Sequence, residues 1–106
     1  HGGRTLDSAP PTAEVLPRIA DALAGTLPLL VDGGIRRGTD ILKAMALGAN
    51  AVLVGKPYVF GLANAGALGV AHVLRLLRDE LEIAMALCGC ATLDAIPAGL
   101  LGAGQP

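Results

Sequence analysis

The sequence predicts an α/β fold built on a parallel β-sheet. Two short aliphatic runs, residues 29–31 and 51–54, lack polar alternation and lead into glycine, as strands buried on both faces do. A helical pattern separates them, which completes a βαβ unit. A doubly wound sheet and a (β/α)8 barrel both agree with this alternation. A barrel needs about 250 residues, so the chain would form only about its last third.

Composition narrows the function classes. The chain has 106 residues, a net charge of -1, 53% hydrophobic and 16% charged residues, and a mean hydropathy of +0.60. These values exclude a disordered tail and a basic nucleic-acid-binding module. Charges, Gly and Pro interrupt the apolar stretches before the roughly 18 residues of a spanning helix, so we expect a buried apolar interior. The chain starts with His1 and no signal-like segment precedes its first motif, so we expect a fragment of a longer protein.

Two helices flank the first strand. Residues 12–24 place their apolar side chains on one face and predict a helix that Gly25 ends. The helix between the strands is expected to begin with Thr39 as its N-cap, to carry Asp40 in its first turn, and to end at Gly48.

The region after the second strand is predicted to be mainly helical. Glycines at irregular spacing over residues 56–69 indicate a short helix followed by a turn. Apolar residues then recur every three or four positions over 70–88, with charged residues opposite, which predicts a long amphipathic helix. One further short helix is expected after Gly89. Cys88 and Cys90 suit neither a disulfide framework nor a zinc site.

Glycines and cations follow both strands. The segment from Asp32 to Gly38 reads DGGIRRG, and the second strand leads into Gly55, Lys56 and a proline suited to start a helix. Paired glycines let backbone N–H groups approach an anion, a helix N-terminus adds positive potential, and arginine can bind phosphate oxygens with two nitrogens. In barrels, the loops after the last two strands form a recurrent phosphate site. The two loops therefore predict a phosphate cradle.

The opening segment, HGGRTLD, places an imidazole three residues before a guanidinium. An imidazole can act as a base near neutral pH, and a guanidinium can hold a carboxylate at two points. This spacing alone is also common in ordinary surface loops.

Three segments resemble one family in order and spacing: HGGRTLD, DGGIRRGTDILKAMALGANAVLVGKP and GLANAGALGVAHVLRLLRDELEIAMALCGC. They are similar to the C-terminal part of the FMN-dependent α-hydroxy acid dehydrogenases, the family of glycolate oxidase, lactate oxidase, L-lactate dehydrogenase and mandelate dehydrogenase. The resemblance implies an FMN-binding (β/α)8 TIM barrel. Residues 1–106 would be its C-terminal portion, from the end of strand six to helix eight of a single domain.

The resemblance also implies roles for individual residues. His1 matches the active-site base, and Arg4 matches the arginine that binds the substrate carboxylate. The residues that match the cofactor-binding loops are Asp32, Gly33, Gly34, Arg36, Gly55 and Lys56. The chain departs from the family at Thr5, where glutamine is usual, and at Lys56, where arginine is usual. Lysine keeps the charge but loses the planar two-nitrogen geometry.

By this resemblance, the complete protein would oxidise small L-2-hydroxy acids such as lactate, glycolate or mandelate to 2-oxo acids with FMN. Its electron acceptor would be oxygen, a quinone or a cytochrome. A tetramer and a cytoplasmic location are expected, the latter because the chain does not end in Ser-Lys-Leu. The 106 residues alone are expected to be inactive and poorly folded, because a partial barrel has unpaired strand edges.

Two alternatives stay open at this point. Another phosphate-binding FMN barrel, such as type 2 isopentenyl diphosphate isomerase or an enzyme like inosine-monophosphate dehydrogenase, would share the Gly-Gly-Ile-Arg loop. The chemistry of such an enzyme does not require a base and a carboxylate-binding arginine, as His1 and Arg4 would supply, one βα unit before the phosphate loop. A truncated, non-catalytic half-barrel would keep the phosphate-binding geometry without turnover.

Overall fold

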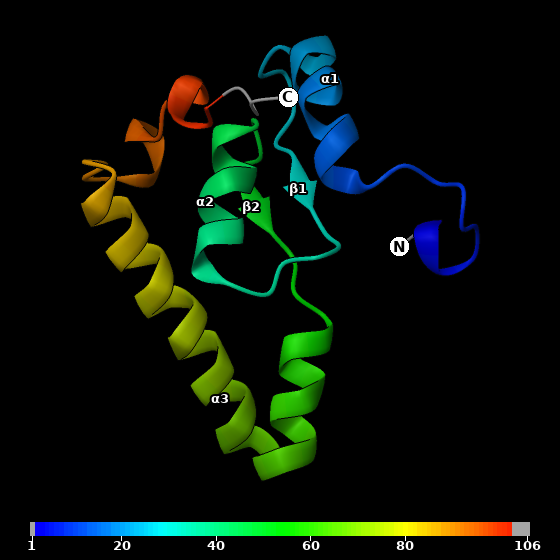
Figure 1. The fold of residues 1–106 in the computed structure, drawn as a ribbon, viewed down its shortest axis with the longest axis vertical. Helices are drawn as coiled ribbons and strands as arrows, with labels where there is room; N and C mark the ends of the chain where they lie inside the picture. Colours follow the sequence, from blue (N-terminus) through cyan, green and yellow to red (C-terminus); the bar gives the residue numbers. More distant parts are fainter. Residues whose placement is uncertain (1, 103–106) are drawn as a thin grey trace.

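The computed structural model describes residues 2–102. Its elements follow a β/α order, with 3₁₀ turns at both ends of the described chain (Figure 1). In order, they are η1 (Gly2–Arg4), α1 (Thr12–Leu23), β1 (Leu30–Val31), α2 (Gly38–Ala46), β2 (Ala51–Val52), α3 (Lys56–Leu87), η2 (Leu93–Ala95) and η3 (Ala98–Leu100).

The two strands pair in parallel, as predicted. Leu30 is opposite Ala51, and Val31 is opposite Val52. The Leu53 N–H extends the pairing by donating to the Val31 carbonyl at 2.8 Å. Because both strands run the same way, the loops that follow them leave the sheet at the same edge, the lower ends of the strands in Figure 1.

One face of this sheet carries the core. The buried core residues are Leu16 of α1, Val31 of β1, Ile35 of the loop after β1, Ala44 of α2, and Ala49. The expectation that both faces are buried was wrong within the described residues. Leu30 is 57% exposed and Leu53 is 52% exposed. Side chains alternate along a strand, so α1 and α2 cover one set of side chains, while no described element covers the other.

Two predicted helix boundaries differ in the structure. Helix α1 ends at Leu23, and its C-cap, Ala24, adopts a left-handed conformation (φ 47°) one residue before Gly25. The N-cap of α2 is Arg37, so Thr39 already lies inside the helix. Asp40 lies in the first turn and Gly48 has φ 104°, both as predicted.

Helix α3 is a helical hairpin. The chain leaves helical geometry at Ala65 and Gly66, where Gly66 has φ 57°, and this separates the predicted short helix from the long one. Gly61 and Gly69 lie on facing arms, where a Cβ on Gly61 would come within 2.6 Å of the Gly69 carbonyl oxygen. These two glycines therefore act as a close helix crossing rather than as breaks. The second arm runs back alongside α2 (Figure 1).

By length and composition alone, α3 is also the one helix of residues 2–102 that could cross a membrane. Its charge-free part, residues 57–74, contains the turn at Ala65 and Gly66. The arm before the turn rises only roughly 14 Å, against a hydrocarbon core of about 30 Å. The arm after it carries five charged residues over 75–82. Neither arm combines the required length with the required lack of charge.

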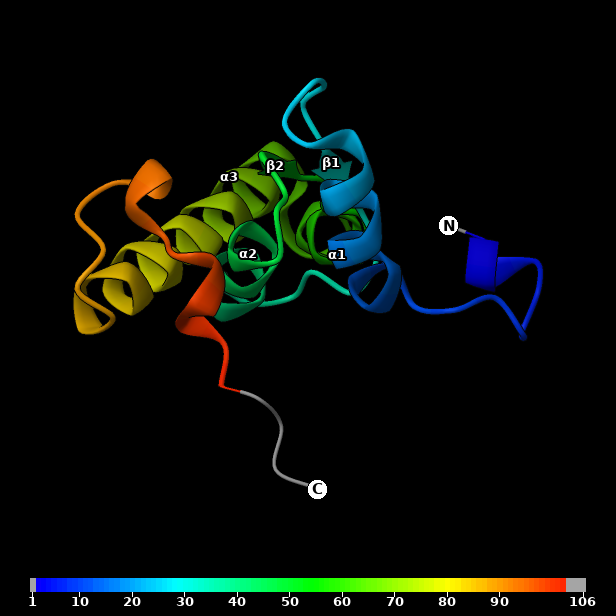
Figure 2. The same cartoon turned by 90° about the horizontal axis from the view of Figure 1, so that it is seen from above.

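The segment after Cys90 contains two single 3₁₀ turns, η2 and η3, instead of the one short helix expected (Figure 2). Each turn is followed by extended backbone, at Ile96 and Leu101. Pro97 separates the turns, because it fixes φ and cannot donate a helical hydrogen bond.

Replacing Gly38 with alanine is expected to separate α2 from α3. A Cβ at Gly38 would overlap the Leu81 backbone nitrogen and lie 2.5 Å from the Glu80 carbonyl carbon, and backbone cannot rotate aside. Overpacking of this kind costs about 1–3 kcal/mol, and here we expect the upper end of that range. Urea unfolding of the complete protein would measure the change. Gly3→Ala is the matched control, because a Cβ there meets nothing within 4 Å. An unchanged midpoint for Gly38→Ala would contradict the close packing.

Candidate functional site

One cavity of about 720 Å³ lies at the edge of the sheet where both strands end. Its walls come from the turn at residues 2–4, the loop after β1, and the loop that leads from β2 into α3. All seven described residues predicted for the site line it: Arg4, Asp32, Gly33, Gly34, Arg36, Gly55 and Lys56. His1, the predicted base, lies outside the described residues.

The loop after β1 needs glycine at two consecutive positions. Gly33 has φ 93° and Gly34 has φ 77°, a region that residues with a Cβ rarely adopt. The Thr12 hydroxyl anchors the loop by donating to the Asp32 carbonyl at 2.7 Å, and a Cβ on Gly33 would lie 3.2 Å from that hydroxyl. A Cβ on Gly34 would meet nothing within 4 Å. The Gly34 backbone therefore borders open space in the cavity.

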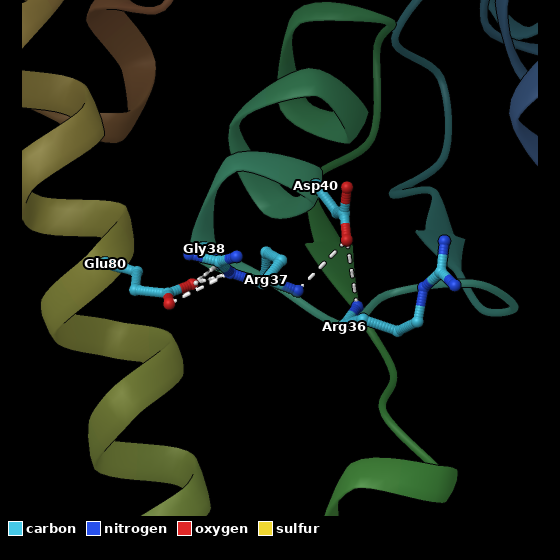
Figure 3. Close-up of polar contacts among 5 residues, drawn as sticks. All are labelled: Arg36, Arg37, Gly38, Asp40 and Glu80. Atoms are coloured by element: carbon cyan, nitrogen blue, oxygen red, sulfur yellow. Dashed lines mark hydrogen bonds and ion pairs between the residues drawn. The ribbon is translucent and has the colours of Figure 1, made fainter.

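The N-terminus of α2 is already occupied by carboxylates. The Arg36 and Arg37 N–H groups each donate to Asp40 Oδ2 at 3.0 Å, and the Gly38 N–H donates to Glu80 Oε2 at 2.8 Å (Figure 3). These three amides are therefore already paired within the protein and do not donate to the cavity. Within residues 2–102, the backbone N–H groups of Gly33, Gly34 and Lys56 donate to no protein acceptor.

The two adjacent arginines point in different directions (Figure 3). Arg36 lines the cavity, whereas Arg37 points to α3 and forms an ion pair with Glu80 at 3.0 Å. The Glu80 carboxylate therefore neutralises Arg37, and only Arg36 is directed to the cavity from this pair. The ion pair with Arg37 and the hydrogen bond from Gly38 lower the pKa of Glu80 below its ordinary value of 4.5.

The cavity is electropositive. Arg4, Arg36 and Lys56 contribute three cationic side chains, against the single carboxylate of Asp32. Lys56 is the first residue of α3, where unpaired N–H groups add partial positive charge, and Pro57 stabilises this helix start as predicted. Cations, glycine amides and a helix end around one cavity form a binding site for an anion.

Sequence patterns missed two residues that build this site, Thr12 and Glu80. A signal for Glu80 was present, because it lies three residues after Leu77 and four before Ala84, on the buried side of α3. A carboxylate on an apolar helix face requires a partner. No comparable signal marks Thr12, whose partner is a backbone carbonyl 20 residues away.

The Glu80 carboxylate makes stability depend on pH. Arg37 and Gly38 favour its ionised form, and Asp40 is the other charged group that acts on this pair. A lowered folded-state pKa gives stabilisation that is complete above pH 4.5 and is lost as pH falls through the lower folded value. The difference in urea midpoint between the complete protein and its Glu80→Gln variant should therefore shrink as the pH is lowered from 6 to 3. A difference that stays constant over this range would contradict the ion pair.

Comparisons with known proteins agree on one family. A profile described as FMN-dependent dehydrogenase matches residues 1–103. The chain belongs to the FMN-dependent dehydrogenase family. It is 57% identical over 101 residues to an L-lactate oxidase of Roseobacter sp. (strain GAI101). This match covers 95% of this chain and 27% of the relative. It is also 57% identical over 96 residues to a peroxisomal (S)-2-hydroxy-acid oxidase of Oryza sativa subsp. japonica. This match covers 91% of this chain and 26% of the relative.

Solved structures of the family give the same result. A mandelate oxidase variant solved with (S)-mandelic acid is 52% identical and superposes with a TM-score of 0.88, covering 92% of this chain and 29% of that one. A variant of mandelate oxidase with an FMN adduct gives a TM-score of 0.89. The expected fold, a C-terminal part of a (β/α)8 barrel, is confirmed. The chain spans between a quarter and a third of the length of these relatives.

Proposed function

We propose that residues 1–106 form the C-terminal portion of a single barrel domain in a flavin oxidoreductase. The complete protein would oxidise small L-2-hydroxy acids to 2-oxo acids with FMN. One observation carries this proposal: the fold gathers all seven described residues assigned by the family resemblance around one cavity. The relatives support the substrate class, since they are named as oxidases of lactate, mandelate and other 2-hydroxy acids.

The cavity fits the phosphate end of FMN. A phosphate dianion needs cations and N–H donors, and the cavity offers Arg36, Lys56 and the unpaired amides of Gly33 and Gly34. Its volume of about 720 Å³ is within the range typical of cofactor sites. The open space beside Gly34 allows an oxygen atom to approach the backbone. Asp32, on the same wall, can accept hydrogen bonds from the hydroxyl groups of the ribityl chain.

Arg4 and His1 would act on the substrate. The guanidinium of Arg4 would bind the substrate carboxylate through two nitrogens and hold the hydroxyl-bearing carbon in place. His1, three residues earlier, would accept a proton from the substrate as it is oxidised. When bound, FMN supplies the redox chemistry by accepting the two electrons. Arg4 lines the same cavity as Arg36 and Lys56, which supports its assignment to the same site.

The rest of the barrel would complete the site. Leu30 and Leu53 project from the strands and are more than half exposed, as residues of a barrel interior are when the other strands are not included. Further ligands of the carboxylate and the group that orients His1 would come from those strands. The proposal therefore concerns the complete protein, and the 106 residues alone are expected to be inactive.

Anaerobic flavin reduction tests the proposal. The complete protein should purify with FMN, and its visible flavin absorbance should bleach when (S)-lactate, glycolate or (S)-mandelate is added without oxygen. The opposite enantiomers, (R)-lactate and (R)-mandelate, serve as controls and should leave the absorbance unchanged. A protein that holds no FMN, or whose flavin none of these acids reduces, would contradict the proposal.

Three further features are part of the proposal. The relatives are named oxidases, which makes oxygen the acceptor that we propose first, ahead of a quinone or a cytochrome. Consumption of one oxygen per substrate oxidised would test it. We also propose a homotetramer in the cytoplasm, to be tested by light scattering and by cell fractionation.

A further inference from the structure

Glu80 lies outside the cavity but is bonded to the loop that forms it. Its two carboxylate oxygens accept from Arg37 Nε, each at 3.0 Å, and Oε2 also accepts from the Gly38 N–H at 2.8 Å. These contacts join residues 42 and 43 positions apart in the sequence. One side chain of α3 thus holds the last residue of the glycine loop, Arg37, and the first residue of α2, Gly38.

The contact is rigid because the backbones are close. Gly38 packs directly on the Glu80 and Leu81 backbone, with no room for a Cβ. Glu80 therefore approaches the Gly38 N–H from a fixed helix and not from a flexible surface segment. The exposed pairs on the same arm, Arg75–Asp79 and Arg78–Glu82, join only residues of α3 itself.

The bonds decide which arginine faces the cavity. Asp40 binds the N–H groups of Arg36 and Arg37, and Glu80 binds the next N–H, so three consecutive peptide units are held in place. Glu80 also draws the Arg37 side chain to α3. The neighbouring side chain, Arg36, is left on the opposite side of the loop, where it lines the cavity (Figure 3).

We infer that Glu80 is a positioning residue for the phosphate-binding loop, acting through Arg37 and Gly38 to direct Arg36 and the glycine amides at the anion. The inference rests on the proposed function, because it assumes that the anion is the FMN phosphate. It assigns the two adjacent arginines different roles: Arg36 binds the ligand, and Arg37 fastens the loop to α3.

Comparing FMN with riboflavin isolates the phosphate. The two differ only in the phosphate group, so the ratio of their dissociation constants reports the phosphate site and not the ring site. In the deflavinated complete protein, Glu80→Gln should weaken FMN binding by about tenfold, the lower end of the loss seen when an outer-shell partner is removed at a metal site. Riboflavin binding should change less than twofold. Flavin fluorescence quenching measures both dissociation constants.

Glu82→Gln is the matched control. It removes the same charge from the same arm and breaks the Arg78 pair, which does not touch the loop, so the ratio should be unchanged. Arg37→Gln breaks the Glu80 pair from the other side but leaves the Gly38 hydrogen bond available, so we expect a smaller loss in the same direction. If Glu80→Gln does not yield folded protein, Arg37→Gln carries the test.

The outcomes distinguish a failure of the proposed function from a failure of the positioning role of Glu80. An unsubstituted protein that binds riboflavin as tightly as FMN would contradict the proposed function. If that protein prefers FMN and the Glu80 and Arg37 variants keep the full preference, the positioning role is wrong while the proposed function stands. Equal loss of both flavins would assign Glu80 a general structural role. Tighter FMN binding in Glu80→Gln would show that a released Arg37 binds the phosphate itself, which also overturns the inference.

Discussion

Replacing His1 with glutamine in the complete protein is expected to lower kcat by roughly a hundred- to ten-thousand-fold, the usual contribution of a positioned general base. Glutamine keeps a polar side chain of similar reach but cannot accept and hold a proton near neutral pH. The proposed FMN-binding loops lie elsewhere in the sequence, from residue 32 onwards, so the variant should still purify with its flavin. Stopped-flow measurement of anaerobic flavin reduction would give the rate directly.

The pH profile gives a second readout for His1. Reduction by the unsubstituted protein should fall at acidic pH with the titration of an imidazole, and this limb should be absent from the residual activity of His1→Gln. His72→Gln is the matched control, because it removes the only other histidine. Full activity in His1→Gln, or a large loss in His72→Gln, would show that His1 is not the base.

Replacing Arg4 with alanine is expected to lower kcat/KM by roughly thirty- to several-thousand-fold, corresponding to the about 2–5 kcal/mol lost when one partner of a desolvated charge pair is removed. The substrate carboxylate would then have no cation in the position that Arg4 provides. The loss should be seen in KM and in the dissociation constant of a non-reactive carboxylate such as acetate, measured by the shift of the flavin spectrum.

Arg4→Lys separates charge from geometry. Lysine restores the charge without the planar pair of donors, so activity should recover only in part. Thr5→Gln, which introduces the residue usual in the family, should change kcat/KM less than threefold. An unchanged KM in Arg4→Ala would show that Arg4 does not bind the substrate.

Local patterns were sufficient for the two strands, the main helices and the two glycine loops of the anion site. Apolar runs predicted the two strands, and the paired glycines with Arg36 and Lys56 predicted the anion site, because a βαβ unit brings the ends of parallel strands to one edge. The roles of His1 and Arg4 came only from the resemblance to a family. Their spacing is too common to indicate catalysis by itself.

Local sequence patterns could not predict contacts between segments that are distant in the sequence. The alternation of strands and helices, the two glycine loops and the hairpin at Gly66 follow from local chemistry, so the sequence by itself determined them. Only the tertiary structure decided that Arg36 faces the cavity while Arg37 is held by Glu80, and that Gly61 and Gly69 form a crossing. The physical reason is that adjacent arginines have the same intrinsic preferences. A carboxylate 43 residues away, brought close by folding, makes them different.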